Sequence, residues 1–229
     1  MASILSRLFR PFTQSASSTL KMSTSSTTSA AKTIPEGAEQ ATVAAGCFWG
    51  VEHLYRKHFG DKGLYDARVG YIGGDAADPS YKAVCSGNTG RTFFLFPIPL
   101  SYTFSETNSP CPTDAEATLL TYDPTRLTYA QLLSFFYRMH DPTTLNQQGP
   151  DRGTQYRSGI FYHNPEQEKI AREVTAKANE QWWGGKIVTE LLPAKQWWDA
   201  EDYHQEYLVK NPYGYECPSH VLREFPELK

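Results

Sequence analysis

The chain has 229 residues, 40% of them apolar, and a formal net charge of −3. It is long enough to bury one good core, and nothing in it indicates a second globular domain. Four cations lie before residue 36, and without them the net charge of the chain is −7. We therefore do not expect a nucleic-acid-binding surface. No apolar run is long enough to cross a bilayer. The four cysteines form no C-x-x-C pair and the six histidines are scattered, so we expect neither a disulfide scaffold nor a metal site.

Residues 1–38 differ in composition from the rest of the chain. The first 35 residues are rich in Ser and Thr, carry four cations and contain no acidic residue, which is typical of a mitochondrial presequence. A disordered tail is the alternative. Met22 can start a shorter form without this segment, so we predict a mitochondrial location, a cytoplasmic one, or both. Residues 39–229 are then the folded domain.

A single cysteine follows the first predicted strand. Residues 41–45 (ATVAA) predict a short buried strand, and apolar residues at helical spacing over 51–59 predict a helix. Cys47 lies at the start of that helix, where free amides and the helix dipole stabilise an anion, so we expect a lowered pKa and a reactive thiolate. Gly46 and Gly50 allow backbone and substrate to approach closely. The alternative is a buried structural cysteine.

The rest of the chain alternates strands with helices. Predicted strands cover residues 67–72, 117–122, 158–162 and 187–192, predicted helices begin after Thr128 and Asn164, and a short helix covers 200–208. Thr128 and Gln131 form a capping box, and Asn164 caps a helix that opens with Pro165. A polar loop precedes residue 155. Without a Gly-rich phosphate loop, this alternation predicts a two-layer α/β sandwich with a mixed sheet, followed by an extended C-terminal tail.

Five motifs, in order, resemble those of peptide-methionine (S)-S-oxide reductase, the class A methionine sulfoxide reductase. They are GCFWGVE at 46–52, VGY and GG within 69–74, PSY to CSG at 79–87, DRGTQYRS at 151–158 and NPYGY at 211–215. The resemblance spans residues 41–223. It implies a ferredoxin-like form of the α/β sandwich and reduction of methionine S-sulfoxide, free or in oxidised proteins, to methionine.

The resemblance also implies roles for individual residues. Cys47 would attack the sulfoxide sulfur as a thiolate. Glu116 matches the family's acid, and burial would raise its pKa so that it can donate a proton. Tyr81 and Tyr156 match two tyrosines whose hydroxyls can hold the sulfoxide oxygen, and Asp151 matches a carboxylate that organises this network. Taken singly, the tyrosines can equally be half-buried rings and Asp151 a turn residue.

Two aromatic residues and a second thiol complete the predicted site. Phe48 and Trp49 would form the apolar pocket for the S-methyl group and select the epimer. Turnover would leave Cys47 as a sulfenic acid, and Cys217, in a tail that can swing, would condense with it to give a disulfide. The spacing before Cys217 includes one residue that some family members lack. Cys85 is predicted to be a core thiol.

The same resemblance implies the reductant and partners. Thioredoxin would reduce the disulfide by thiol exchange, with dithiothreitol as its substitute in vitro. No bound cofactor is implied, because the electrons come through thiols. We expect a monomer that binds thioredoxin and oxidised proteins.

One segment departs from the family pattern Thr-Gly-His-Ala-Glu. Here residues 91–114 separate Thr89-Gly90 from Ala115-Glu116, and the histidine is absent. The segment is apolar and aromatic without a helical or alternating period, and we assign its Cys111 no role. One hypothesis is that this segment is a translated intron. If Arg91 is encoded CGT and Thr113-Asp114 are encoded ACA-GAC, removal of the stretch from GT through AG joins C to AC and restores a histidine codon. Sequencing the spliced transcript tests this hypothesis. A real insertion is the other; loop closure tolerates it, but it could misplace Glu116.

Two other functions fit parts of the sequence. A cysteine hydrolase is suggested by Cys47 followed by aromatic residues, but it needs a histidine base, and no histidine lies in a recognisable partner motif. A catalytically impaired isoform that binds methionine sulfoxide is suggested by residues 91–114. Dependence on dithiothreitol separates a reductase from a hydrolase, and turnover separates it from a binding protein.

Overall fold

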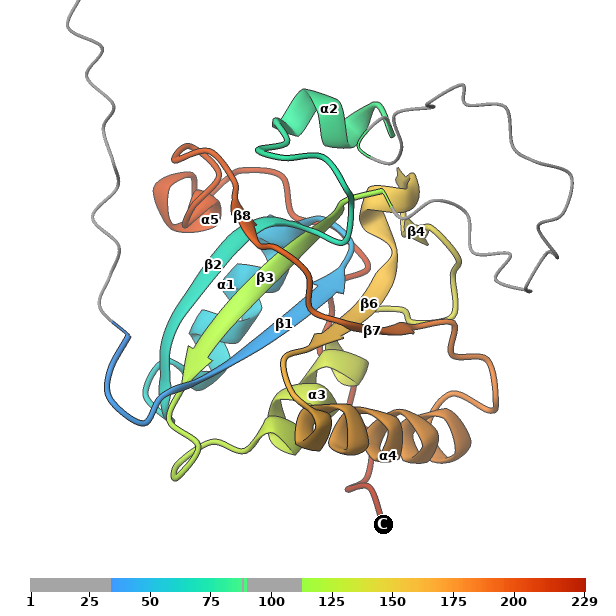
Figure 1. The fold of residues 1–229 in the computed structure, drawn as a ribbon. Helices are drawn as coiled ribbons and strands as arrows, with labels where there is room; N and C mark the ends of the chain where they lie inside the picture. The colour runs from blue at the N-terminus through green and yellow to red at the C-terminus, as the bar shows by residue number, and fades with distance from the viewer. Residues whose placement is uncertain (1–33, 88, 90–112) are drawn as a thin grey trace, which may run out of the picture. The chain divides into compact units, whose positions relative to one another are not determined.

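A six-stranded mixed sheet forms one layer of the fold (Figure 1). The computed structural model describes residues 34–87, 89 and 113–229. The strands are β1 (Glu39–Ala45), β2 (Leu64–Ile72), β3 (Ala115–Tyr122), β6 (Ser158–Tyr162), β7 (Glu190–Pro193) and β8 (Trp198–Asp199). Their order is β7-β6-β1-β3-β2-β8, and only β6 and β7 are parallel. The predicted mixed sheet is confirmed, whereas the ferredoxin-like assignment stays a prediction.

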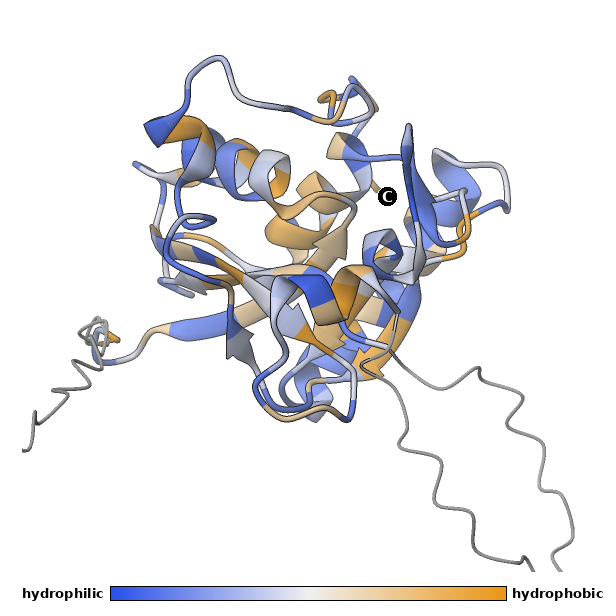
Figure 2. Ribbon diagram, turned by 90° about the horizontal axis from the view of Figure 1, so that it is seen from above, coloured by the Kyte–Doolittle hydropathy of each residue, from blue (hydrophilic) through white to orange (hydrophobic). Residues whose placement is uncertain are grey.

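Three helices pack on one face of this sheet. They are α1 (Phe48–Phe59), α3 (Tyr129–Met139) and α4 (Pro165–Gln181), and their apolar residues share one core with β1, β2 and β3. The Tyr55 hydroxyl of α1 donates to the Leu132 carbonyl of α3 over 3.0 Å. Figure 2 shows the apolar stretches gathered in the interior. On the other face, Ala44 and Phe161 pack against the chain that joins β7 to β8, as the alternation of side chains along a strand requires.

Local signals in the sequence account for two helix starts. The Thr128 side chain accepts from Gln131 N while the Gln131 side chain accepts from Thr128 N, so the predicted capping box is present. The Asn164 side chain accepts from Gln167 N, with Pro165 in the first turn. Each cap satisfies amides that the first helical turn leaves free.

The helix predicted over 200–208 is wrong for most of its length. Only α5 (Tyr207–Lys210) is helical in this region. Gln205 instead bonds with its side chain to both the N–H and the carbonyl of Val69 on β2, over 3.0 and 2.8 Å, and Glu206 has a φ of +52°. Polar side chains that a helix would expose are used here to fasten the segment to the sheet edge.

Smaller differences concern strand ends and short elements. The last predicted strand begins at Glu190 rather than residue 187, because Val188 N donates to the Pro142 carbonyl and does not pair with β6. The predicted polar loop contains a two-stranded hairpin of β4 (Gln147–Gln148) and β5 (Asp151–Arg152) and a 3-10 turn, η1 (Thr154–Tyr156). A short helix, α2 (Tyr81–Cys85), was not predicted.

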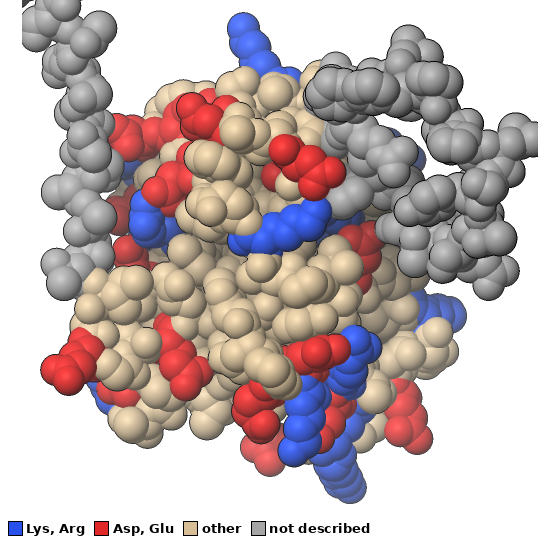
Figure 3. Space-filling view, viewed as in Figure 1, with Lys and Arg blue, Asp and Glu red and all other residues tan. Residues whose placement is uncertain are grey.

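Several predictions fall on other parts of the chain. Residues 1–33, most of the segment 91–114 and Cys111 lie outside the described residues. Within the described part, no helix is both long and apolar enough to span a membrane. On the face in Figure 3, basic side chains gather mainly over α4, where acidic ones alternate with them.

Thr89, which precedes the atypical segment, and Asp114, its last residue, lie side by side. Asp114 N donates to Thr89 Oγ1 over 2.9 Å, and Asp114 Oδ1 accepts from Gly74 N over 2.9 Å. From there β3 pairs regularly with β2, and Tyr71 lies opposite Glu116. The expectation that an insertion would misplace Glu116 is therefore wrong for this structure, because the strand register, not the preceding segment, fixes its position.

Candidate active site

Cys47 is the N-cap residue of α1, directly after β1. The predicted helix start is confirmed. Gly46 turns the chain with a φ of +89°, which favours glycine. The cysteine is only 6% exposed, so its thiol is buried.

Gly46 and Gly50 are needed because other parts of the chain come close to them. A Cβ on Gly46 would lie 2.5 Å from Cβ of Gln148, and a Cβ on Gly50 would lie 2.3 Å from Nδ1 of His220. We had expected these glycines to admit the substrate. In the structure it is the protein's own side chains that occupy the space beside them.

Replacing Gly50 by alanine is expected to destabilise the fold by about 1–3 kcal/mol, because the new methyl group overpacks a buried contact. Helix propensity alone would predict a gain of up to about 1 kcal/mol, so the sign of the effect reports the contact with His220. Urea unfolding measures it. The double variant Gly50→Ala/His220→Ala should cost less than the sum of the single changes; a stabilised Gly50→Ala would contradict this explanation.

The pKa of Cys47 is raised, and our prediction of a lowered pKa is wrong for the resting protein. Burial is the main cause, and the Glu116 and Asp151 carboxylates add to it, while the nearby N–H of Trp49 acts in the opposite direction. The helix N-terminus stabilises a thiolate, but removing the charged sulfur from water costs more than this stabilisation provides. Cys47 therefore rests as a neutral thiol.

Glu116 extends from β3 to the same helix terminus. Its Oε2 accepts from Phe48 N over 3.3 Å, and Oε1 has no hydrogen-bond partner among the described residues. The residue is 1% exposed, and burial raises its pKa to about 8. The expectation of a raised pKa is confirmed: at neutral pH this carboxyl group holds a proton that it can donate.

Tyr81 and Tyr156 both lie within electrostatic reach of Glu116. Burial raises the pKa of each hydroxyl, and the Glu116 charge is the next cause in both cases. The Tyr81 hydroxyl is also hydrogen-bonded to the Cys85 thiol. Cys85 itself is exposed, so the predicted core position is wrong: α2 lies at the surface and turns this residue outward.

Asp151 and Cys217 also lie within electrostatic reach of Cys47. Asp151 accepts from the Tyr215 hydroxyl over 2.9 and 3.0 Å, and its charge contributes to the raised pKa of the Cys217 thiol. Cys217 is 1% exposed, burial raises its pKa to about 11, and it interacts electrostatically with Cys47. The two thiols of the predicted pair are therefore within electrostatic reach of each other, and their pairing stays a prediction. Tyr215, which belongs to the motif NPYGY, was not assigned a role from the sequence.

Aromatic rings form one side of the site. Phe48 is buried in a cluster that also contacts Trp49 and Tyr81. The Trp49 indole stacks on Tyr207 with ring centroids 3.7 Å apart, and its N–H donates to His204 Nδ1 over 3.0 Å. Neither His204 nor Tyr207 was predicted to belong to the site, because their partner Trp49 lies about 155 residues away in the sequence. Residues 203–207 (YHQEY) combine aromatic and polar side chains on every side of a helix, and this pattern differs from that of a solvated helix face.

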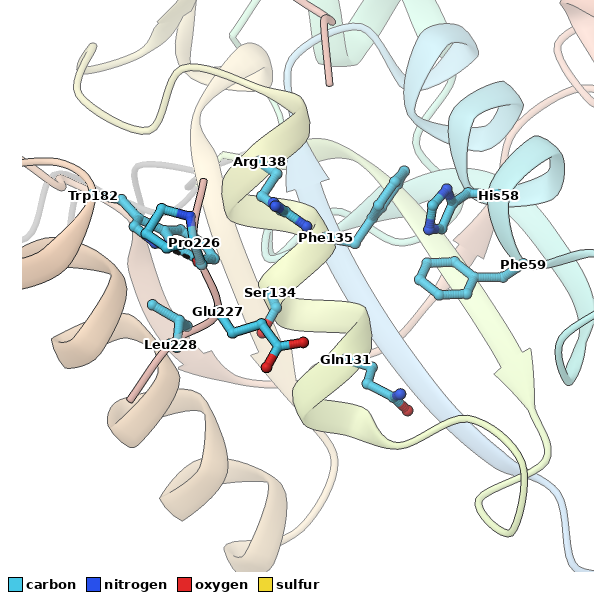
Figure 4. A pocket seen from close by; sticks show the side chains of 10 residues that line it. All are labelled: His58, Phe59, Gln131, Ser134, Phe135, Arg138, Trp182, Pro226, Glu227 and Leu228. Atoms are coloured by element: carbon cyan, nitrogen blue, oxygen red, sulfur yellow. Dashed lines mark hydrogen bonds between the residues drawn. The ribbon is translucent and has the colours of Figure 1, made fainter. Parts of the chain in front are cut away.

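A groove of about 390 Å³ lies elsewhere and contains none of the predicted site residues (Figure 4). It is lined by the ends of α1 and α4, by α3 and by residues 226–228, with the Arg138 guanidinium 5.7 Å from the Trp182 ring. Among the residues that the structure describes, no group of three or more His, Cys, Asp or Glu could hold a metal ion.

Sequence comparisons find one family. A family model described as peptide methionine sulfoxide reductase matches residues 39–93 and 101–226, so the match is interrupted inside the segment 91–114. A probable peptide methionine sulfoxide reductase from Schizosaccharomyces pombe is 46% identical over 185 residues, 80% of this chain and 95% of the relative. The peptide methionine sulfoxide reductase of Saccharomyces cerevisiae is 44% identical over 192 residues, 80% of this chain and 89% of the relative.

Solved structures agree. Mxr1 from Saccharomyces cerevisiae in reduced form has a TM-score of 0.71 and 41% identity, covering 84% of this chain and 96% of that one. Mxr1 in complex with Trx2 has a TM-score of 0.53 and 28% identity, covering 86% and 97%.

Fold and site define an oxidoreductase of the thiol-dependent class, with a buried cysteine beside a buried, protonated acid. The match over most of the chain makes the family specific. The chain belongs to the peptide methionine sulfoxide reductase family, and the resemblance predicted from five motifs is confirmed.

Proposed function

We propose that this protein reduces methionine S-sulfoxide, free or in oxidised proteins, to methionine. The observation that carries the proposal is the meeting of Cys47 and Glu116 at the start of α1, with Glu116 Oε2 bonded to Phe48 N. A thiol that takes the oxygen and an acid that protonates it are the two groups the reaction needs.

The first step moves the equivalent of one oxygen atom from the sulfoxide to Cys47. The Cys47 sulfur loses its proton and bonds to the sulfoxide sulfur, while the sulfoxide oxygen takes up that proton and one from Glu116 and leaves as water. A water molecule then attacks the Cys47 sulfur, the S–S bond breaks, methionine leaves, Cys47 is left as a sulfenic acid, and the proton released returns to Glu116. Glu116 donates its proton to the oxygen as negative charge develops there, and the hydroxyls of Tyr81 and Tyr156 stabilise the same atom. Because Cys47 rests as a neutral thiol, substrate binding must precede loss of its proton.

Epimer selection follows from the aromatic side of the site. Phe48 and Trp49 offer the apolar surface for the S-methyl group, while Glu116 lies beside Phe48. With the methyl group and the oxygen each directed to its own partner, only one sulfoxide epimer presents its sulfur to Cys47.

The second step regenerates the thiol. The Cys217 thiol condenses with the Cys47 sulfenic acid, which forms a disulfide and releases water. A thioredoxin then reduces the disulfide by thiol exchange, a role supported by the relative solved with Trx2. The reaction requires no bound cofactor in this scheme.

The alternative functions have less support. A hydrolase needs a histidine at the thiol, but no histidine is among the groups that shift the pKa of Cys47, of which Glu116 is the foremost, and the ring of His220 is bonded to the Ala45 carbonyl. A binding protein without turnover would need Glu116 displaced, and it lies in register on β3. We therefore propose that the chain is active with residues 91–114 in place, and that residues 1–38 direct one form to mitochondria.

The test is an assay of the full chain on the S and R epimers of a methionine sulfoxide peptide with dithiothreitol. We expect reduction of the S epimer only, and none without dithiothreitol after the first turnover. A variant in which a histidine replaces residues 91–114 serves as the matched control. Activity in the control alone would show that the segment inactivates the chain, and absence of activity in both would refute the proposal.

A further inference from the structure

His220 lies where the C-terminal tail meets the turn that carries Cys47. It is 5% exposed, and its Nε2 is 2.6 Å from the carbonyl oxygen of Ala45, the last residue of β1. Its ring fills the space beside Gly50 and lies 3.5 Å from where a Cβ on Gly46 would be. The ring therefore contacts the turn on both sides of Cys47.

The hydrogen bond defines the state of this histidine. A carbonyl oxygen can only accept, so Nε2 must carry the proton and donate it. Burial lowers the pKa of His220, which keeps the ring neutral and leaves Nδ1 as a bare acceptor, without a partner among the described residues. A neutral donor fixed in this tautomer is suited to hold two chain segments together rather than to move protons.

His220 is coupled to Cys217 through a short turn. His220 N donates to the Cys217 carbonyl over 2.9 Å. On the other side of that turn, the Cys217 thiol donates to the Gln148 carbonyl over 3.4 Å, and the Gln148 side chain packs against Gly46. Thiol and ring thus hold the tail to the Cys47 turn at separate points.

We propose that His220 is a positioning residue for the disulfide step, in which Cys217 resolves the oxidised Cys47. This inference rests on the proposed function. In that step the S–O bond of the Cys47 sulfenic acid and the S–H bond of Cys217 break, and an S–S bond and water form. Its rate depends on how often the second thiol lies within reach, and anchoring the tail two residues before Cys47 raises that frequency.

Three substitutions test the role of the Nε2 donor. His220→Gln places an amide N–H near the position of Nε2, whereas His220→Asn is too short to reach Ala45, and His220→Leu keeps the bulk without the donor. Each variant is first checked for a cooperative unfolding transition. The reduced proteins then receive excess S-sulfoxide peptide without reductant. Methionine release and disulfide formation are followed separately by quenched mass spectrometry, with dimedone to trap the sulfenic acid.

We expect all forms to release methionine in the first step at rates within about threefold of the parent protein. Disulfide formation should slow by at least about tenfold in His220→Asn and His220→Leu, with dimedone adducts accumulating on Cys47, and His220→Gln should recover most of the rate. Equal rates of disulfide formation in the parent and the Asn variant would overturn the inference, as would an equal slowing of both steps. If the parent protein releases no methionine, it is the proposed function that fails.

Discussion

Cys47→Ser is expected to abolish reduction of methionine S-sulfoxide, with a loss of at least about a thousandfold in kcat/KM. A serine hydroxyl nearly keeps the size of the side chain, but it is a far weaker nucleophile and forms no sulfenic acid. The thiol is 6% exposed, so the substitution alters a chemical group at a site whose packing is preserved. The assay is methionine release from the S-sulfoxide peptide with dithiothreitol.

Cys217→Ser is the matched control, because it makes the same change in the second buried thiol. This variant should release one methionine per chain in the absence of reductant and form no intramolecular disulfide, whereas Cys47→Ser should release none. If Cys47→Ser kept its activity, Cys47 would return to the structural role that we considered as the alternative. If Cys217→Ser lost the first turnover too, Cys217 would act before the disulfide step.

The sequence predicted the fold where local and long-range signals agree. The period of apolar residues located β1 and α1, and the capping residues Thr128 and Asn164 located two helix starts. Such signals concern neighbours in the chain, so one sequence is sufficient to detect them. The site residues were predicted from the family resemblance and not from local patterns. Tyr81, Glu116 and Asp151 carry no local signal of chemistry, and only their place in dispersed motifs pointed to them.

The failures have a common physical cause: the electrostatics and packing of a residue depend on what surrounds it in space. The helix start at Cys47 predicts an acidic thiol, but burial and two carboxylates decide otherwise. The segment before α5 has helix-forming residues, yet Gln205 binds the edge of β2. His204 and His220 were scattered histidines in the sequence, and each became meaningful only through its partner, Trp49 or Ala45.

Glu116→Gln is expected to lower kcat by about 10²–10⁴-fold. The amide keeps the size of the side chain and its oxygen can still accept from Phe48 N, but it cannot donate a proton as an acid. In the parent protein the rate should fall as the pH rises through about 8, because the acid form of Glu116 is lost there. The Gln variant should lack this fall. The kcat of the two proteins measures the first effect, and the pH dependence of kcat/KM for the S-sulfoxide peptide measures the second.

Stability provides a check on Glu116 that does not involve catalysis. Its pKa rises from an ordinary 4.5 to about 8 on folding, so the folded state binds the proton more tightly than the unfolded chain does. This contribution to stability is complete below about pH 4.5 and is lost as the pH rises through about 8. Glu52, with a pKa raised by burial to about 7, adds a term of the same sign that Glu116→Gln leaves in place. The Gln variant should therefore show a weaker decline of unfolding free energy with pH over roughly pH 5 to 8, the window between the two pKa values of Glu116, as measured by urea unfolding. A decline as steep as in the parent protein would mean that Glu116 is ionised in the folded state, and the proton for the sulfoxide oxygen would have to come from Tyr81 or Tyr156.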